Sequence, residues 1–174
     1  MQKPTHRKYQ LVTKHHHMRN PFIYLSMIAL LLVGACKKDS TQEIDTEYPV
    51  IDISSTGAFP KQCSTVKRGE KFTFRAQLSD NTTLGSVSVD IHHNFDHHTH
   101  STEVESCTMD VVKTPVKPFL LIQSYPIPVG LANFEVQQEI TIPADVDAGD
   151  YHFMIRLTDK EGWQTIKGLS IKVI

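Results

Sequence analysis

The sequence lacks the features of several large functional classes. Its main apolar run, Phe22 to Val33, is too short for a comfortable transmembrane helix. It contains no nucleophile-elbow or oxyanion-hole motif, so we expect a protein that is not an enzyme. No helix of convincing length is predicted after residue 35 either, which excludes helical folds.

The N-terminal segment resembles a secretory signal. Met18 to Pro21 form a short basic region, and Phe22 to Val33 form an apolar core of the expected length. Leu32 to Cys36 then read as a bacterial lipobox, in which Cys36 is lipidated and becomes the mature N-terminus. We therefore expect residues 1–35 to be removed, whether translation begins at Met1 or at Met18.

Basic residues are scarce in the predicted mature chain. Residues 1–35 hold five of the 18 Lys and Arg and none of the 19 Asp and Glu, which leaves 13 basic against 19 acidic residues. This excess of acid argues against nucleic acid as a partner. We expect residues 36–47 to form a polar, flexible tether and residues 48–174 to form one domain.

Cysteine is also scarce, because only Cys63 and Cys107 follow the lipobox. An extracytoplasmic location permits a disulfide between them, which would stabilise the fold by about 4 kcal/mol in the chain-entropy model. Two alternatives stay open, namely free thiols and a Cys107 thiolate that ligates a metal.

Alternating apolar residues predict β-strands along most of the chain. The clearest strands lie at residues 50–53, 72–78, 87–92, 134–142, 151–157 and 164–174, with an irregularity expected at 137–138. Residues 109–112 and 119–122 are less readable candidates. Ala148 to Tyr151 resemble the tyrosine corner that opens strand F of immunoglobulin-like domains. We predict an all-β, immunoglobulin-like Greek-key sandwich of about seven strands.

Histidine is the residue that the sequence concentrates. Five of its ten histidines lie within residues 92–100, with carboxylates interleaved, and imidazole is the commonest protein ligand for metals. His98 and His100 have the spacing that places two side chains on one side of an extended segment. Asp96 has the same phase and could ligate the ion or orient an imidazole. An imidazole-rich site favours Zn(II) or Cu(II) over Ca(II) or Mg(II).

The predicted fold adds a distant histidine to this group. If residues 87–92 are strand C and residues 151–157 are strand F, the two strands are antiparallel neighbours. The alternation then places His92 and His152 on the same outward face, opposite each other. The predicted ligand set is His92, His98, His100 and His152, supported by Asp96.

Other residues near the cluster receive more ordinary roles. His93 and His97 fall in the opposite phase and are left out of the ligand set, and Phe95 is expected to anchor the loop in the core. Asp90 and Asp150 are interpreted as a solvated face. A histidine-rich loop can also be merely solvated, in which case no metal site exists.

The run from Asp90 to His100, followed by Gly149 to Phe153, resembles an uncharacterised family of Bacteroidetes lipoproteins with an immunoglobulin-like domain of unknown function. The family pattern maps onto Ile91, His92, Asn94, Phe95, Asp96, His98 and His100. Here His93 and His97 stand where the family more often has Asn and Gly, and His adopts positive φ less readily than Gly. The resemblance covers residues 46–174 and implies an envelope location and a fold, with no activity.

The leading hypothesis is therefore a metal-binding lipoprotein, anchored through Cys36, that acts as a scavenger, sensor or delivery module for Zn or Cu. Lys37 is not the aspartate that retains lipoproteins at the inner membrane, so we expect the outer membrane, on its periplasmic or cell-surface face. The alternative is an adhesion or glycan-binding module whose histidines hold a structural ion or none. Catalysis is a third reading, because three histidines with an open position could activate water.

Overall fold

The computed structural model describes residues 44–174, and the structural statements below concern this range. The predicted signal segment and the lipidation site at Cys36 lie outside it. No helix of the described part is long and apolar enough to cross a bilayer. The strands are β1 (Val50–Asp52), β2 (Ser64–Val66), β3 (Lys71–Ser79), β4 (Leu84–His93), β5 (Leu121–Pro126), β6 (Asn133–Thr141), β7 (Gly149–Asp159) and β8 (Gln164–Val173).

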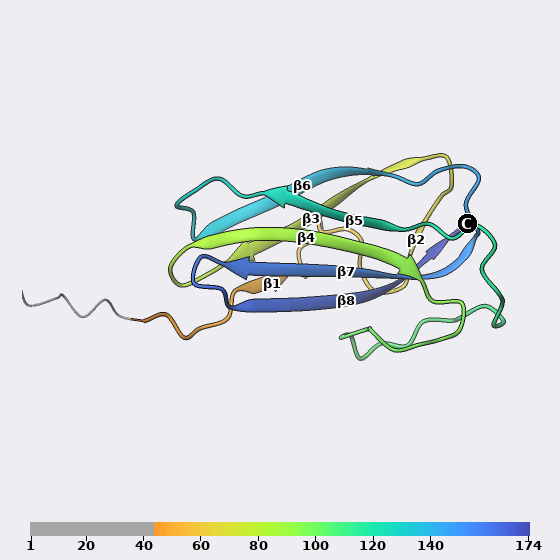
Figure 1. Ribbon diagram of the computed structural model, residues 1–174, viewed down its shortest axis with the longest axis horizontal. Coiled ribbons are helices and arrows are strands. Elements are labelled where there is room, and N and C mark those ends of the chain that lie inside the picture. The colour runs from red at the N-terminus through yellow and green to blue at the C-terminus, as the bar shows by residue number, and fades with distance from the viewer. Residues whose placement is uncertain (1–43) are drawn as a thin grey trace, which may run out of the picture. The chain divides into compact units, whose positions relative to one another are not determined.

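These strands form two sheets (Figure 1). One sheet has the order β1-β3-β6 and the other has the order β2-β8-β7-β4-β5. All neighbours are antiparallel except β2 and β8. In this arrangement β4 and β7 take the central places of strands C and F in immunoglobulin domains. The prediction of an all-β, immunoglobulin-like sandwich is confirmed.

The core forms because one face of each long strand is apolar. In β4 the residues Val87, Val89 and Ile91 are fully buried, and the residues between them are more exposed. β7 contributes Phe153, whose ring lies 5.3 Å from that of Phe74 in the opposite sheet. The two apolar faces therefore close on each other, and the polar faces of β4 and β7 point away from the core.

The weakest sequence signals were interpreted correctly only in part. The short strand β2 was not predicted, and residues 109–112 form no strand. β5 begins two residues later than predicted and continues to Pro126, which it tolerates because β5 is an edge strand of its sheet. The irregularity expected at 137–138 is absent, because Gln138 takes an inward position opposite Phe74 in an unbroken register.

A tyrosine corner and a disulfide fix the connections at the end of the sandwich that carries the histidines. The Tyr151 hydroxyl donates a hydrogen bond to the Asp147 carbonyl at 2.7 Å and accepts one from the Phe119 amide at 3.1 Å, which is the predicted tyrosine corner. Burial raises the pKa of this phenol. Cys63 and Cys107 form the predicted disulfide, which excludes Cys107 as a thiolate ligand.

Candidate metal centre

The site begins where β4 and β7 lie side by side. Their register pairs His92 directly with His152, as the alternation predicts. Both side chains lie on the face of the sheet that points away from the core. The pairing brings together two imidazoles that are 60 positions apart in the sequence, with ring centres 5.4 Å apart.

The chain turns immediately after β4 and returns over the outward face of the sheet. The Asn94 amide donates to the Asp150 carbonyl at 2.8 Å, and Phe95 is buried in the core, 5.3 Å from the Tyr151 ring. His97 has a φ of 62°, so this turn needs the left-handed conformation for which glycine is suited. Asn94 and Phe95 therefore anchor the loop, as predicted for Phe95, and the turn at His97 reverses its direction.

The returning loop lies on strand β8 at Gly168. The Thr102 amide donates to the Gly168 carbonyl at 2.9 Å, and the Gly168 amide donates to the Thr102 hydroxyl at 3.1 Å. A Cβ atom at position 168 would lie only 2.0 Å from the His100 carbonyl oxygen. Glycine is therefore required here, because it lets the loop backbone approach the strand closely enough to place His100.

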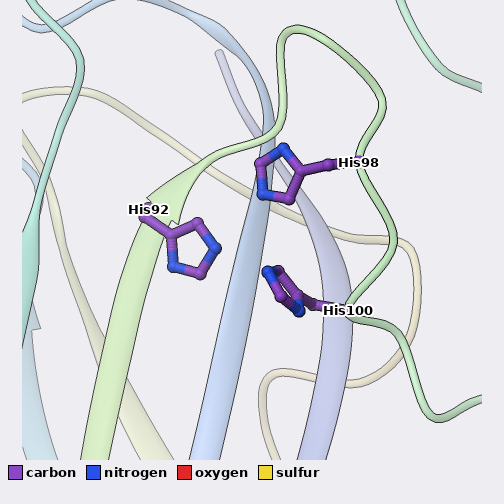
Figure 2. A group of neighbouring side chains, drawn as sticks. All are labelled: His92, His98 and His100. Atoms are coloured by element: carbon purple, nitrogen blue, oxygen red, sulfur yellow. The ribbon is translucent and has the colours of Figure 1, made fainter.

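These elements bring three imidazoles to one point (Figure 2). His92, His98 and His100 each offer one ring nitrogen, and the three nitrogens lie within 4.8 Å of one another. Nitrogens bound to a single zinc ion at about 2.0–2.1 Å stand roughly 3.4 Å apart, so a small closing movement suffices to coordinate one ion. The predicted ligands His92, His98 and His100 therefore fit a transition metal.

Two carboxylates orient two of these rings. His92 Nδ1 lies 2.8 Å from Asp90 Oδ1, and His98 Nδ1 lies 2.5 Å from Asp96 Oδ1. A carboxylate accepts, so each Nδ1 carries the proton and each Nε2 keeps its lone pair for a metal. The bond from His98 also lowers the pKa of the Asp96 carboxyl. This carboxylate–histidine pairing is typical of metal sites.

His152 lies close to the other three rings and makes a contact that the sequence did not predict. Its ring centre is 5.0 Å from that of His98 and 5.3 Å from that of His100, but its nitrogens do not belong to the close group. His152 Nε2 instead donates to the His98 carbonyl at 3.0 Å. The structure thus brings three of the four predicted ligands together and leaves His152 outside this group, with its Nε2 bonded to the loop backbone.

Burial keeps His152 neutral. The side chain is 1% exposed, and desolvation lowers its pKa from 6.5 to about 4, with the neighbouring histidines adding to the effect. Its Nδ1 has no hydrogen-bond partner among the described residues. His152 faces outward as predicted, but the loop covers it completely.

The remaining polar residues differ from the sequence interpretation in part. Asp90 is the orienting partner of His92, and Asp150 is 8% exposed and accepts the Asp110 amide at 2.7 Å, so neither is a mere solvated face. His93 packs against Phe95 at 4.9 Å, and His97 donates to the Asp110 carbonyl. No signal in the sequence indicates Gly168, because its role arises from the contact between the loop and β8.

Comparison with known proteins places the chain in a family. A family model described as "Domain of unknown function (DUF4625)" matches residues 34–174. A search of curated proteins found no match. Among solved structures the chain is similar to one described as "GspB Siglec domain", with 21% sequence identity and a TM-score of 0.39. That match covers 75% of this chain and 59% of the other, so the chain spans less than two thirds of that structure.

Proposed function

The chain belongs to this family of domains of unknown function (DUF4625), and we propose that it binds one divalent transition-metal ion through His92, His98 and His100. The observation that carries the proposal is the pairing of two of these rings with Asp90 and Asp96. A solvated histidine loop does not require such pairs, whereas a metal site uses them to fix the tautomer and the ring direction. An all-imidazole set suits zinc or copper.

The exposure of the site supports reversible binding. The His92 and His98 side chains are 25% and 32% exposed, and His100 is an exposed residue. Structural zinc sites are closed by four protein ligands, whereas three ligands leave a position for an exchanging group. A cavity of about 340 Å³ adjoins His92 and His100 and gives access from solvent. We therefore propose a scavenger, sensor or delivery module.

The proposed location is the bacterial outer membrane, on its periplasmic or cell-surface face. The lipobox at Leu32 to Cys36 supports a lipid anchor on Cys36, and the family resemblance supports an origin among Bacteroidetes lipoproteins. We propose binding rather than catalysis, because the sequence contains no nucleophile motif beside the histidines.

The test is calorimetric titration of the full chain with Zn(II) and Cu(II), after elemental analysis of the purified protein. His15, His16 and His17 are replaced by Gln in all samples, so that these histidines do not compete for metal. One ion is expected to bind per chain. His98→Ala and His100→Ala should each weaken binding by about 100-fold or more, because each removes a ligand and leaves two.

His97→Asn is the matched control, because His97 belongs to the same loop and is not a ligand, and Asn tolerates its positive φ. This variant should bind with unchanged affinity.

His152→Ala should lose less affinity than His98→Ala. Unchanged binding in the His98→Ala, His100→Ala double variant would refute the proposal. Loss of near-ultraviolet circular dichroism on chelation would favour the alternative, a structural ion in an adhesion or glycan-binding module.

A further inference from the structure

A second group of acidic side chains lies at the other end of β7. Three segments meet there: Asp45 precedes β1, the turn from Asp80 to Thr83 joins β3 to β4, and the turn from Asp159 to Trp163 joins β7 to β8. The indole of Trp163 donates to the Asp45 carbonyl at 2.8 Å, and the Lys160 amide donates to the Thr83 carbonyl at 3.0 Å. These bonds hold the three segments together.

Carboxylates from two of these segments lie close together. Asp45, Asp159 and Glu161 each offer one oxygen, and these oxygens lie within 4.8 Å of one another. The Thr82 hydroxyl lies 2.9 Å from an Asp45 oxygen, 3.0 Å from an Asp80 oxygen and 3.3 Å from a Glu161 oxygen. One hydroxyl has a single proton to donate, so it satisfies only one of these three acceptors.

Buried oxygens without partners are a second, independent observation that points to a cation site. Asp159 is 3% exposed, and its Oδ1 accepts the amides of Gly162 and Trp163 at 2.6 Å and 2.8 Å. Its Oδ2 is buried and has no hydrogen-bond partner among the described residues, and the same holds for Asp80 Oδ1. A buried carboxylate oxygen without a partner is costly, and a bound cation removes that cost.

This acidic group has no countercharge from the part of the chain that the structure describes. Within residues 44–174, no lysine, arginine or histidine forms an ion pair with any of the four carboxylates. Asp45 is 7% exposed, and the Glu47 amide that donates to it at 2.9 Å is the main cause of the lowered pKa of its carboxyl. Carboxylates brought together without a countercharge repel each other, so the arrangement needs a cation from solution.

We propose that this group is a calcium site, formed by Asp45, Asp159 and Glu161 with Asp80 and Thr82 beside them. Calcium takes six to eight oxygen ligands at about 2.3–2.6 Å, so two of its ligands can stand up to about 5 Å apart. The group offers oxygens only and no imidazole, which suits a hard cation and not zinc or copper. The ion ties the segment at Asp45 to the turns that follow β3 and β7.

The calcium site is separate from the histidine site. His152 and Asp159 lie on the same strand, seven residues apart, which corresponds to roughly 23 Å at the rise of a strand. At physiological ionic strength this distance exceeds the screening length of about 8 Å. The two ions are therefore bound independently.

The test uses the full chain and titrates it with CaCl₂ by calorimetry and with terbium by luminescence. Trp163 is the only tryptophan of the chain and contacts Asp45, so terbium bound here is sensitised by tryptophan excitation. We expect one calcium ion per chain, with a dissociation constant on the order of 10⁻⁴ M as in extracellular modules. Calcium should displace terbium and quench the emission.

Glu161→Gln is the main variant, because Glu161 is exposed and its one side-chain hydrogen bond is to Thr82. It should weaken calcium binding about tenfold or more, as should Asp159→Asn, whose amide oxygen can still accept from the turn. Glu139→Gln, an exposed position on β6, is the matched control and should leave the affinity unchanged. The His98→Ala, His100→Ala double variant should also keep it.

Three results would overturn the calcium assignment. The first is no saturable calcium binding at millimolar concentration. The second is equal affinity in Glu161→Gln and the parent chain. The third is magnesium competing equally with calcium, because Mg²⁺ demands a smaller octahedral site.

Discussion

At the scale of single residues, two aspartates decide which nitrogen of two histidines is available to a metal. Asp90 and Asp96 each hold the Nδ1 proton of the histidine two positions later. Asp90 and His92 share a side because they lie two apart in strand β4, whereas Asp96 and His98 meet across the turn at His97. Both pairs are local in the sequence, although only Asp96 was predicted to orient an imidazole.

Asp96→Ala should lower metal affinity about 10-fold to 100-fold, because the His98 ring loses its orientation and its fixed tautomer. Thr99→Ala, in the same exposed loop, is the control and should keep the parent affinity. Calorimetric titration of both variants with Zn(II) measures the effect. Equal affinity in Asp96→Ala and Thr99→Ala would show that Asp96 does not orient the ligand.

The metal-free protein should lose stability as the pH falls from about 6.5 to about 4. In the folded state burial lowers the pKa of His152 to about 4, whereas the unfolded chain has the ordinary value near 6.5. Between these values the unfolded state binds more protons, so the free energy of unfolding decreases with falling pH, by up to about 3 kcal/mol. Below pH 4 this contribution no longer changes.

Urea unfolding of chelator-treated protein at several pH values measures this loss. His152→Gln should show a shallower dependence over the same range, because the variant has no imidazole to protonate at this position. The difference between the two curves isolates His152 from the exposed histidines nearby. Identical slopes would contradict the prediction.

At the scale of elements, the loop after β4 is placed by its contact with β8. Gly168→Ala should weaken metal binding at least about tenfold, because the added Cβ would lie 2.0 Å from the His100 carbonyl and push His100 away. The sandwich should stay folded, since the change lies on the outer face. Gly57→Ala, where a Cβ meets only the Arg75 side chain, is the control. Zinc titration and circular dichroism check both points.

The alternation of apolar residues predicted the part of the fold that carries the site. It gave the strands at 87–92 and 151–157, their pairing and the opposition of His92 and His152, because each of these strands buries one face. β2 could not be predicted, because three residues that pair with β8 carry no period of their own. Residues 109–112 were a candidate strand from their sequence, but they are exposed and form no strand.

The same distinction applies to the candidate site: its local features were predicted, and its tertiary contacts were not. His92, His98, His100 and Asp96 were predicted because their spacing is local. The hydrogen bond from His152 to the His98 carbonyl and the close approach at Gly168 depend on how the loop crosses two strands. Contacts of this kind arise from tertiary structure, so the periodicity of apolar residues in the sequence does not predict them.

At the scale of the whole molecule, the two proposed ion sites should stabilise the fold additively. Each ion at 100 times its dissociation constant should add about 2.7 kcal/mol to the free energy of unfolding. Sites this far apart with no shared ligand should sum within about 0.5 kcal/mol. Urea unfolding with Zn(II), with Ca(II), with both and with neither measures the four values. If the sum of the two separate effects differs by more than about 1 kcal/mol from the effect of both ions together, the sites are coupled.

All three proposed ligands lie within residues 92–100, and the segment that carries two of them is bonded to β8 through Thr102 and through the ion pair between Glu103 and Lys167. An ion can therefore depart when this segment lifts, while the ladder between β4 and β7 stays intact. The disulfide at Cys107 limits how far the segment travels. If the proposed ion binds, we expect its release rate to depend on the lifting of this segment and not on global unfolding.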